Sequence, residues 1–199
     1  MTRFTKRIIL GSNSPRRKEL LKGLDIDYTI DTGNSFDEYI DPSAEPHEVP
    51  VCMSVGKSHG FHRPLECGEV LITADTVVIV TPEGSDKPVV LGKPHSREDA
   101  IEILRTLSGR THEVVTAVTL RDSEKETTFT DSTLVTFNGL SDDEISYYID
   151  KYRPFDKAGA YGVQEWIGYV AISRLEGSFY NVMGFPVHKV YKELMKFVG

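Results

Sequence analysis

The chain has 199 residues, a length that suits one large domain or two small ones with a proper core. Its net charge of −7 argues against general binding to nucleic acid, which needs a basic excess, but is compatible with a local basic pocket for a small anion. The two cysteines have neither metal-ligand nor disulfide spacing, and no apolar run is long enough for a membrane span or a secretory signal, so we expect a cytoplasmic protein that does not contact membranes.

Apolar runs and helical patterns alternate along the chain, which is typical of an α/β domain with a mixed sheet. The first half predicts, in order, a strand at 7–10, a helix at 15–24, a short strand at 28–31, a polar loop at 32–46, a weak helical pattern at 48–62 and a strongly apolar strand at 70–80. The last of these strands should be central in the sheet, because it is apolar on both faces.

The second half continues the alternation. It predicts a short strand at 89–91, a helix at 96–107, a hairpin of strands at 113–121 and 127–137, a helix at 141–152, a strand at 169–175 and a C-terminal helix from 187. No linker separates independent domains, so we expect residues 1–199 to form a single domain. The glycine-rich stretches 159–162 and 176–184 are candidates for the walls of a cleft, because glycine lets backbone approach a ligand closely.

The stretch GSNSPRRKELL at 11–21 places two arginines where a helix ordinarily avoids them. Ser14 is a good N-cap and Pro15 a good first helical residue, so Arg16 and Arg17 fall in the first turn, at the positive end of the helix dipole. A phosphate group there would accept hydrogen bonds from free backbone N–H groups, from the hydroxyls of Ser12 and Ser14, and from both guanidinium groups. The alternative is an ordinary helix with two solvated arginines.

Asp75 lies inside the apolar run LITADTVVIV, where a carboxylate costs several kcal/mol to bury unless it is paired, hydrogen-bonded or bound to a metal. It is therefore a candidate functional acid, although backbone amides at a bulge would also satisfy it. Lys57 and Lys93 are less informative, because most lysines face solvent. Gly92 and Pro94 restrict the backbone around Lys93, which indicates that the direction of its side chain matters.

The segment FDKAGAYGVQ at 155–164 combines glycines with charged residues and ends in Gln164, whose amide both donates and accepts hydrogen bonds. It is either a recognition loop or a glycine-rich surface loop without a ligand. His59 and His62 are three residues apart, but no third ligand lies near them, so a zinc site is not expected.

Taken together, GSNSPRRKELL, ITADTVVIV, LGKP followed by LSGRTHEVVTAV, DKAGAYGVQ and GSFYNVMGFP resemble, in order and separation, the Maf family of nucleotide pyrophosphatases. The resemblance spans residues 8–186. It implies a mixed α/β fold with an elongated central sheet flanked by helices and two lobes with a cleft between them, similar to inosine triphosphate pyrophosphatases. It also implies metal-dependent hydrolysis of nucleoside triphosphates to monophosphate and pyrophosphate in the cytosol.

The resemblance also implies roles for individual residues. It implies catalytic roles for Asp75 (general base), Glu38 (second acid), Lys57 and Lys93; phosphate binding by Ser12, Arg16 and Arg17; and a divalent ion, Mg²⁺ or Mn²⁺, on Asp75 and Glu38. The polar loop before Glu38 holds one extra residue, so Asp37 is the alternative second acid. This set suits an anhydride with several negative charges, which needs cations to offset developing charge and an acid to activate water.

Three positions separate the branches of the family, and here they read Arg17, Thr76 and Gln164, as in the branch that acts on dTTP and UTP. CTP or modified pyrimidine nucleotides are further substrates that this implies. Three alternatives stay open: the branch that prefers 7-methylguanosine triphosphate, a phosphatase that removes single phosphates, and a nucleotide-binding regulator of septum formation. The expected partner is the nucleotide alone, without nucleic acid or membrane, and a homodimer is compatible with this.

Overall fold

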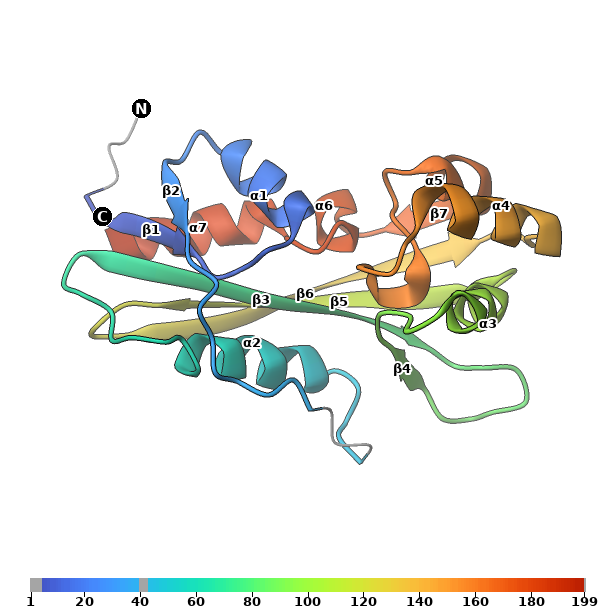
Figure 1. Ribbon diagram of the computed structural model, residues 1–199, viewed down its shortest axis with the longest axis horizontal. Coiled ribbons are helices and arrows are strands. Elements are labelled where there is room, and N and C mark those ends of the chain that lie inside the picture. Colours follow the sequence, from blue (N-terminus) through green and yellow to red (C-terminus); the bar gives the residue numbers. More distant parts are fainter. Residues whose placement is uncertain (1–4, 40–42, 199) are drawn as a thin grey trace. The chain divides into compact units, whose positions relative to one another are not determined.

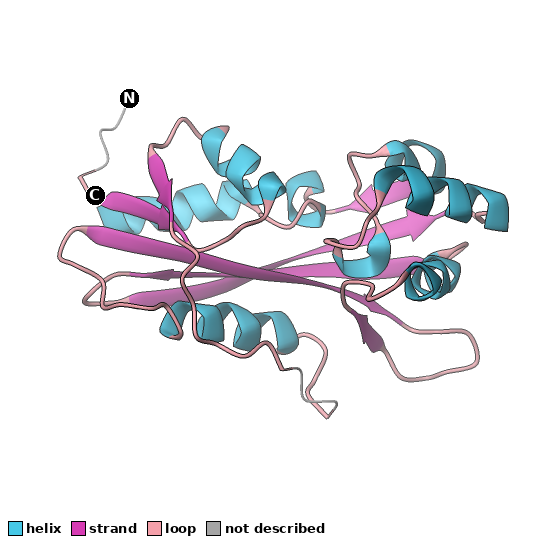
Figure 2. Cartoon of the chain, viewed as in Figure 1, coloured by secondary structure: helices cyan, strands magenta, loops and turns pink. Residues whose placement is uncertain are grey.

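A computed structural model describes residues 5–39 and 43–198 (Figure 1). Helices flank a central sheet (Figure 2). Within the described residues the sheet has seven strands in the order β2-β1-β3-β5-β6-β7, with β4 paired to β3. This confirms the prediction of a mixed α/β fold with a central sheet. The elements are β1 (Arg7–Leu10), α1 (Pro15–Lys22), β2 (Tyr28–Ile30), α2 (Val49–His59), β3 (Glu69–Val80), β4 (Val89–Leu91), α3 (Arg97–Leu107), β5 (Thr111–Arg121), β6 (Glu126–Phe137), α4 (Asp142–Tyr152), η1 (Ala158–Ala160), α5 (Trp166–Ala171), β7 (Ile172–Glu176), α6 (Phe179–Val182) and α7 (Val187–Val198).

The chain forms two compact units, each assembled from several stretches of sequence. Unit 1 comprises Met1–Asp75, Thr116–Asp131 and Gly184–Gly199, and unit 2 comprises Thr76–Val115 and Ser132–Met183. Strands β3, β5 and β6 each contribute residues to both units. That residues 1–199 form a single domain stays a prediction.

In unit 1, β1 pairs in parallel with β2 on one side and with β3 on the other, with Ile8 opposite both Tyr28 and Val70. The apolar residues Ile8, Ile9 and Leu10 of β1 are buried, as expected for a strand in the middle of a parallel arrangement. Helix α2 lies on one side of these strands, and α1 and α7 lie on the other (Figure 1).

In unit 2, β4 runs antiparallel to β3 and β7 runs antiparallel to β6. Helix α4 begins with a capping box, in which Ser141 and Glu144 satisfy each other's backbone N–H groups. Helix α3 is capped by Ser96, whose side chain accepts a hydrogen bond from the N–H of Asp99. None of the helices within the described residues combines the length and the apolar character that crossing a membrane requires.

The predicted strand at 169–175 is wrong in its first three residues, because the chain is helical through Ala171 and extended only from Ile172. Ile167 and Ala171, four residues apart, are buried, whereas Tyr169 is 84% exposed, which is the period of a helix. Gly168 permits this helix to pack tightly, since a Cβ there would lie 1.9 Å from the carbonyl oxygen of Val163. A short apolar run does not distinguish a strand from one helical turn.

Candidate active site

The turn between β1 and α1 folds as the serine and proline pattern predicts. Ser14 is the N-cap of α1, and its Oγ accepts a hydrogen bond from the N–H of Arg17 at 3.4 Å. Ser12 is buried, and its Oγ accepts hydrogen bonds from the N–H of Ser14 at 3.3 Å and from Nη1 of Arg17 at 3.4 Å. Arg16 is half-buried in the first helical turn. The hydroxyl groups and the two arginines thus surround one helix N-terminus, where an anion would be favoured.

Arg17 connects this turn to two other parts of unit 1. Its Nε donates to the carbonyl oxygen of Gly184 at 2.9 Å, and its Nη1 donates to that of Ala74 at 2.9 Å. Burial lowers the pKa of Arg17 from its usual value, and the negative charge of Asp75 opposes that shift. Arg17 therefore holds the backbone next to Asp75, a role that the sequence did not predict, and its contact with phosphate stays a prediction.

Asp75 lies in the middle of β3, where Asp75 and Thr76 are the two half-buried positions in an otherwise buried strand. Its Oδ1 is 2.7 Å from Nζ of Lys57, which α2 presents to the strand. The same Nζ is 3.2 Å from Oε2 of Glu38, in the loop before α2. Three of the predicted catalytic residues therefore meet in unit 1, with the ammonium group between the two carboxylates.

Two glycines that weaken the helical pattern explain how Glu38 reaches Lys57. A Cβ on Gly56 would lie 2.3 Å from the ring of Phe36, and one on Gly60 would lie 2.8 Å from the backbone nitrogen of Phe36. The loop 33–38 thus packs directly on α2 and its C-cap, because glycine leaves no side chain at these two positions. The Nδ2 of Asn34 donates to the carbonyl oxygen of Lys57 at 2.5 Å and holds the loop there.

Of the two candidate second acids, Glu38 has its carboxylate within ion-pair distance of Lys57, and which of the two serves as the second acid stays a prediction. Asp75 is 17% exposed and Glu38 is 56% exposed, so the pair is accessible from solvent on one side. Two carboxylates against one ammonium group leave an excess of negative charge. Oxygen donors with this charge fit Mg²⁺ or Mn²⁺, ions that proteins commonly hold by one or two carboxylates together with substrate phosphates.

Within residues 5–39 and 43–198 there is no group of three or more His, Cys, Asp or Glu side chains that could hold a metal ion. That Asp75 and Glu38 hold a divalent ion stays a prediction.

The other three predicted residues lie in unit 2. Thr76 follows Asp75 in β3, and Lys93 is exposed just after β4, with no ion pair to any of the residues that the structure describes. The carbonyl oxygen of Gly92 accepts a hydrogen bond from the N–H of Gly159 at 3.0 Å, so the GKP segment is attached to the glycine-rich segment. Gln164 is half-buried, and its Oε1 is buried without a hydrogen-bond partner among the described residues.

Sequence reasoning missed the residues that hold the turn around Gln164. The phenol of Tyr148 donates to the carboxylate of Glu165 and accepts from the N–H of Gly162 at 3.0 Å. Nζ of Lys157 lies 3.1 Å from the same carboxylate. Lys157 belongs to the predicted recognition loop and Glu165 directly follows it. Nothing in the sequence connects Tyr148, on α4, to that loop.

The comparisons with known proteins agree with the motifs. A family model described as "Maf-like protein" matches residues 7–197. A "dTTP/UTP pyrophosphatase" from Porphyromonas gingivalis is 51% identical over 193 residues, which cover 96% of this chain and 94% of that relative. Proteins with the same name from Bacteroides thetaiotaomicron and Flavobacterium johnsoniae are 50% and 41% identical, over 95% and 96% of this chain and 95% of each relative.

Among solved structures, a HAM1 protein from Coxiella burnetii matches with a TM-score of 0.47 and 14% identity, over 96% of this chain and 99% of that one.

Proposed function

Because the chain belongs to the family of Maf-like proteins, we propose that it hydrolyses dTTP and UTP to the nucleoside monophosphate and pyrophosphate. The observation that carries this proposal is the contact of Lys57 with both Asp75 and Glu38. Arg17 binds the backbone of Ala74, the residue before Asp75, and so links the turn at α1 to this contact. Acids, a lysine and an anion-binding turn are the parts that cleavage of a phosphoanhydride needs. Relatives named for this activity match nearly the whole chain.

In the proposed reaction, a water molecule attacks the α-phosphorus. The new bond joins the water oxygen to that phosphorus, the bond from the α-phosphorus to the bridging oxygen breaks, and pyrophosphate leaves with the bonding electrons. Asp75 accepts the proton of the attacking water. Lys57 orients the Asp75 carboxylate from 2.7 Å and adds a positive charge beside the reacting phosphates.

The phosphates would bind at the N-terminus of α1, where Ser12 and Arg16 lie, and Lys93 would add a further cation. Asp75 and Glu38 would hold a divalent ion, Mg²⁺ or Mn²⁺, which supplies charge stabilisation to the leaving pyrophosphate when bound. Because Lys57 already neutralises part of the charge of these carboxylates, they would bind a free ion weakly. The phosphates of the nucleotide would supply the remaining oxygen ligands, so the ion would bind together with the nucleotide.

Gln164 would bind the pyrimidine base. Arg17 and Thr76 are the other two positions that distinguish the dTTP/UTP branch of the family. The half-buried Gln164 side chain carries an amide that can accept from the N3–H of uracil or thymine and donate to the neighbouring carbonyl oxygen, whereas N3 of cytosine carries no hydrogen. This favours UTP and dTTP over CTP. We place the enzyme in the cytoplasm, acting on free nucleotides rather than on nucleic acid or membrane, and a homodimer stays a prediction that light scattering would test.

The test is an assay of pyrophosphate and phosphate release with Mg²⁺ across dTTP, UTP, CTP, ATP, GTP and 7-methylguanosine triphosphate. We expect pyrophosphate from dTTP and UTP, and a loss of about 10³-fold in kcat for Asp75→Asn, which keeps the size of the side chain but removes its basic oxygen. Far-UV circular dichroism of the variant should match that of the wild type.

Asp37→Asn is the matched control, because it makes the same change at an exposed acid beside the site, and we expect it to retain turnover. Full activity of Asp75→Asn would contradict the assigned base. Release of single phosphates would make the protein a phosphatase, and cleavage of 7-methylguanosine triphosphate alone would assign the sister branch. Binding of nucleotide without any turnover would favour a regulator.

A further inference from the structure

Gln164 lies at the tip of a tight turn that is closed by a backbone hydrogen bond. The N–H of Glu165 donates to the carbonyl oxygen of Gly162 at 2.9 Å, which makes residues 162–165 a β-turn with Gln164 at its third position. A turn of this kind usually lies on a surface and can move. Here Gly168 of α5 packs so closely behind the turn that a Cβ would meet the carbonyl oxygen of Val163 at 1.9 Å.

A buried tyrosine from another element closes the same turn a second time. Tyr148, on α4, has no exposed surface, and its Oη accepts from the N–H of Gly162 while it donates to the Glu165 carboxylate. One phenol therefore contacts both the first and the last residue of the turn that carries Gln164. Burial and the neighbouring Glu165 raise the pKa of Tyr148, so the phenol stays protonated and remains a donor.

A buried lysine completes the arrangement. Lys157 is 7% exposed, and its Nζ lies 3.1 Å from Oε1 of Glu165 and 2.8 Å from Oδ1 of Asp156. The Glu165 carboxylate also covers Gly162, where a Cβ would lie 2.8 Å from the carboxyl carbon. Buried charges that are paired and hydrogen-bonded tend to specify one geometry, because any other arrangement leaves them without a partner.

We propose that Tyr148, Glu165 and Lys157 are positioning residues that orient the turn 162–165, so that the Gln164 amide meets the pyrimidine base and selects uracil or thymine over cytosine. This inference rests on the proposed function, because it takes the base as the ligand of Gln164. None of the three residues is among those proposed to contact the phosphates. They act on selectivity through Gln164, and a change in them alters binding of the base rather than cleavage of the anhydride.

The experiment is a double-mutant cycle with the non-hydrolysable analogues α,β-methylene-UTP and α,β-methylene-CTP, whose Kd values are measured by calorimetry. We expect Tyr148→Phe to raise the Kd for the UTP analogue about tenfold and that for the CTP analogue less than about twofold, because the turn loses one anchoring hydroxyl. In a Gln164→Ala background, the same Tyr148→Phe change should alter the Kd for the UTP analogue less than about twofold.

Tyr147→Phe is the matched control, since Tyr147 is the exposed neighbour on α4 and, among the residues that the structure describes, its hydroxyl bonds to Lys151 alone; its Kd values should equal those of the wild type. Glu165→Gln gives a second reading: it keeps an acceptor for Tyr148, so it should retain most of the affinity that Glu165→Ala loses. Additive effects of Tyr148→Phe and Gln164→Ala, or equal losses for both analogues, would overturn the inference.

Binding readouts separate this inference from the proposed function. A wild-type protein that binds the UTP analogue but releases no pyrophosphate from UTP would contradict the proposed hydrolysis. The double-mutant cycle would still measure the positioning role, because it depends on binding alone. A wild-type protein that binds neither analogue would overturn the positioning role.

Discussion

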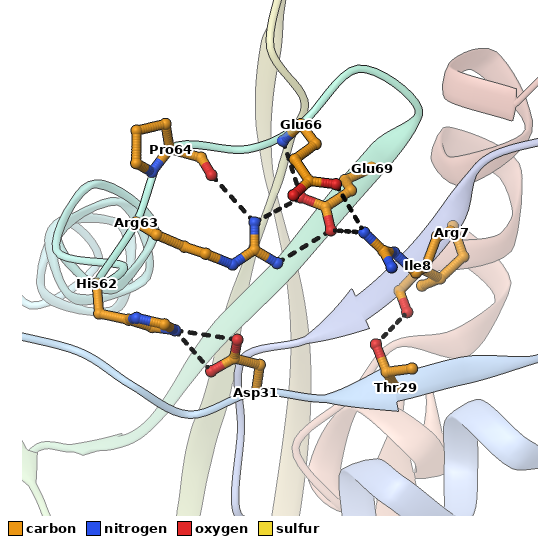
Figure 3. A network of polar contacts seen from close by, with 9 residues as sticks. All are labelled: Arg7, Ile8, Thr29, Asp31, His62, Arg63, Pro64, Glu66 and Glu69. Carbon is orange, nitrogen blue, oxygen red and sulfur yellow. Dashed lines mark hydrogen bonds and ion pairs between the residues drawn. The ribbon is translucent and has the colours of Figure 1, made fainter.

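Glu69, the first residue of β3, is a carboxylate with 1% exposure that two arginines surround (Figure 3). Arg63 binds it through both terminal nitrogens, at 2.7 and 3.0 Å, and Arg7 binds it from the neighbouring strand β1. The N–H of Glu66 donates to it at 2.8 Å. The hydrogen bond from Arg63, more than any other interaction, lowers the pKa of Glu69 from 4.5 to about 2.

The sign of this shift predicts how stability depends on pH. A carboxyl group with a lowered pKa in the folded state stabilises the fold fully above its unfolded value of 4.5, and this contribution is lost as the pH falls from 4.5 towards 2. We expect Glu69→Gln to lower the free energy of unfolding by about 2 kcal/mol at pH 7. The gap between variant and wild type should close as the pH falls through that window, in urea unfolding followed by circular dichroism.

Glu66→Gln serves as the control, because Glu66 faces the same Arg7 at 3.1 Å but is 71% exposed. Exposed pairs contribute little, so we expect a change within about 0.5 kcal/mol at pH 7. A gap between Glu69→Gln and the wild type that stays constant from pH 7 to pH 3 would contradict the assignment to Glu69.

At the scale of the element, the loop that carries Glu38 packs on α2 where glycine lowers the helix propensity of the sequence. Gly56, inside the helix, disfavours it relative to alanine by about 1 kcal/mol, and Gly60 is its C-cap. Both positions are filled instead by Phe36, whose ring and backbone come closer than any Cβ would allow. The glycines thus serve the candidate site and not the stability of the isolated helix.

This predicts an unusual response to alanine at the end of α2. Gly60 has a φ of −76°, which alanine adopts without strain, so any loss must come from the displaced loop. We expect Gly60→Ala to lower the free energy of unfolding by about 1–3 kcal/mol, since its methyl group would push against the backbone of Phe36. Urea unfolding measures this change.

Gly23→Ala is the matched substitution at the end of α1, where φ is −64° and the nearest atom to a Cβ is 3.4 Å away. There the same change should be neutral or stabilising by up to about 1 kcal/mol. If both variants behaved alike, the packing of the loop on α2 would not be what requires glycine at position 60.

The elements also show what sequence patterns could and could not predict. The strands at 7–10 and 89–91 were predicted with their bounds, because short apolar runs between turn residues leave little choice. The packing of Phe36 on α2 was not predicted, because glycine in a helical pattern indicates only a weaker helix. Tyr148 was missed for a related reason: the helical period places its ring in the core but says nothing of what its hydroxyl reaches.

At the scale of the molecule, the sequence was most informative about the candidate site where a charged residue lies in an apolar segment. Asp75 in an apolar strand has few ways to be stable, and the structure gives it Lys57 as a partner. The choice between Asp37 and Glu38 could not come from the sequence, because it depends on how the loop lies on α2. The orphaned Oε1 of Gln164 is likewise a property of the fold and not of a motif.

Neither unit is a continuous piece of chain, and three strands pass through both, so we expect the two units to unfold together. Trp166, the single tryptophan, lies in unit 2 and reports on that unit by fluorescence. In urea, the midpoint of its transition should coincide with that of far-UV circular dichroism.

A reporter in unit 1 makes the comparison complete. Cys52 and Cys67 are both free and exposed, so a fluorophore on Cys52 in a Cys67→Ser background would follow α2. Three coincident midpoints are expected. A tryptophan transition that precedes the Cys52 signal would show that the units unfold separately.

The passage of β3 from unit 1 to unit 2 between Asp75 and Thr76 has a consequence for how such a protein can evolve. Asp75, Glu38 and Lys57 belong to the first unit, whereas Gln164 and the tyrosine that anchors its turn belong to the second. Mutations that change the preferred nucleotide therefore need not disturb the acids and the lysine. A lineage with this division can acquire new substrates by drift at a few positions while every intermediate remains a working hydrolase.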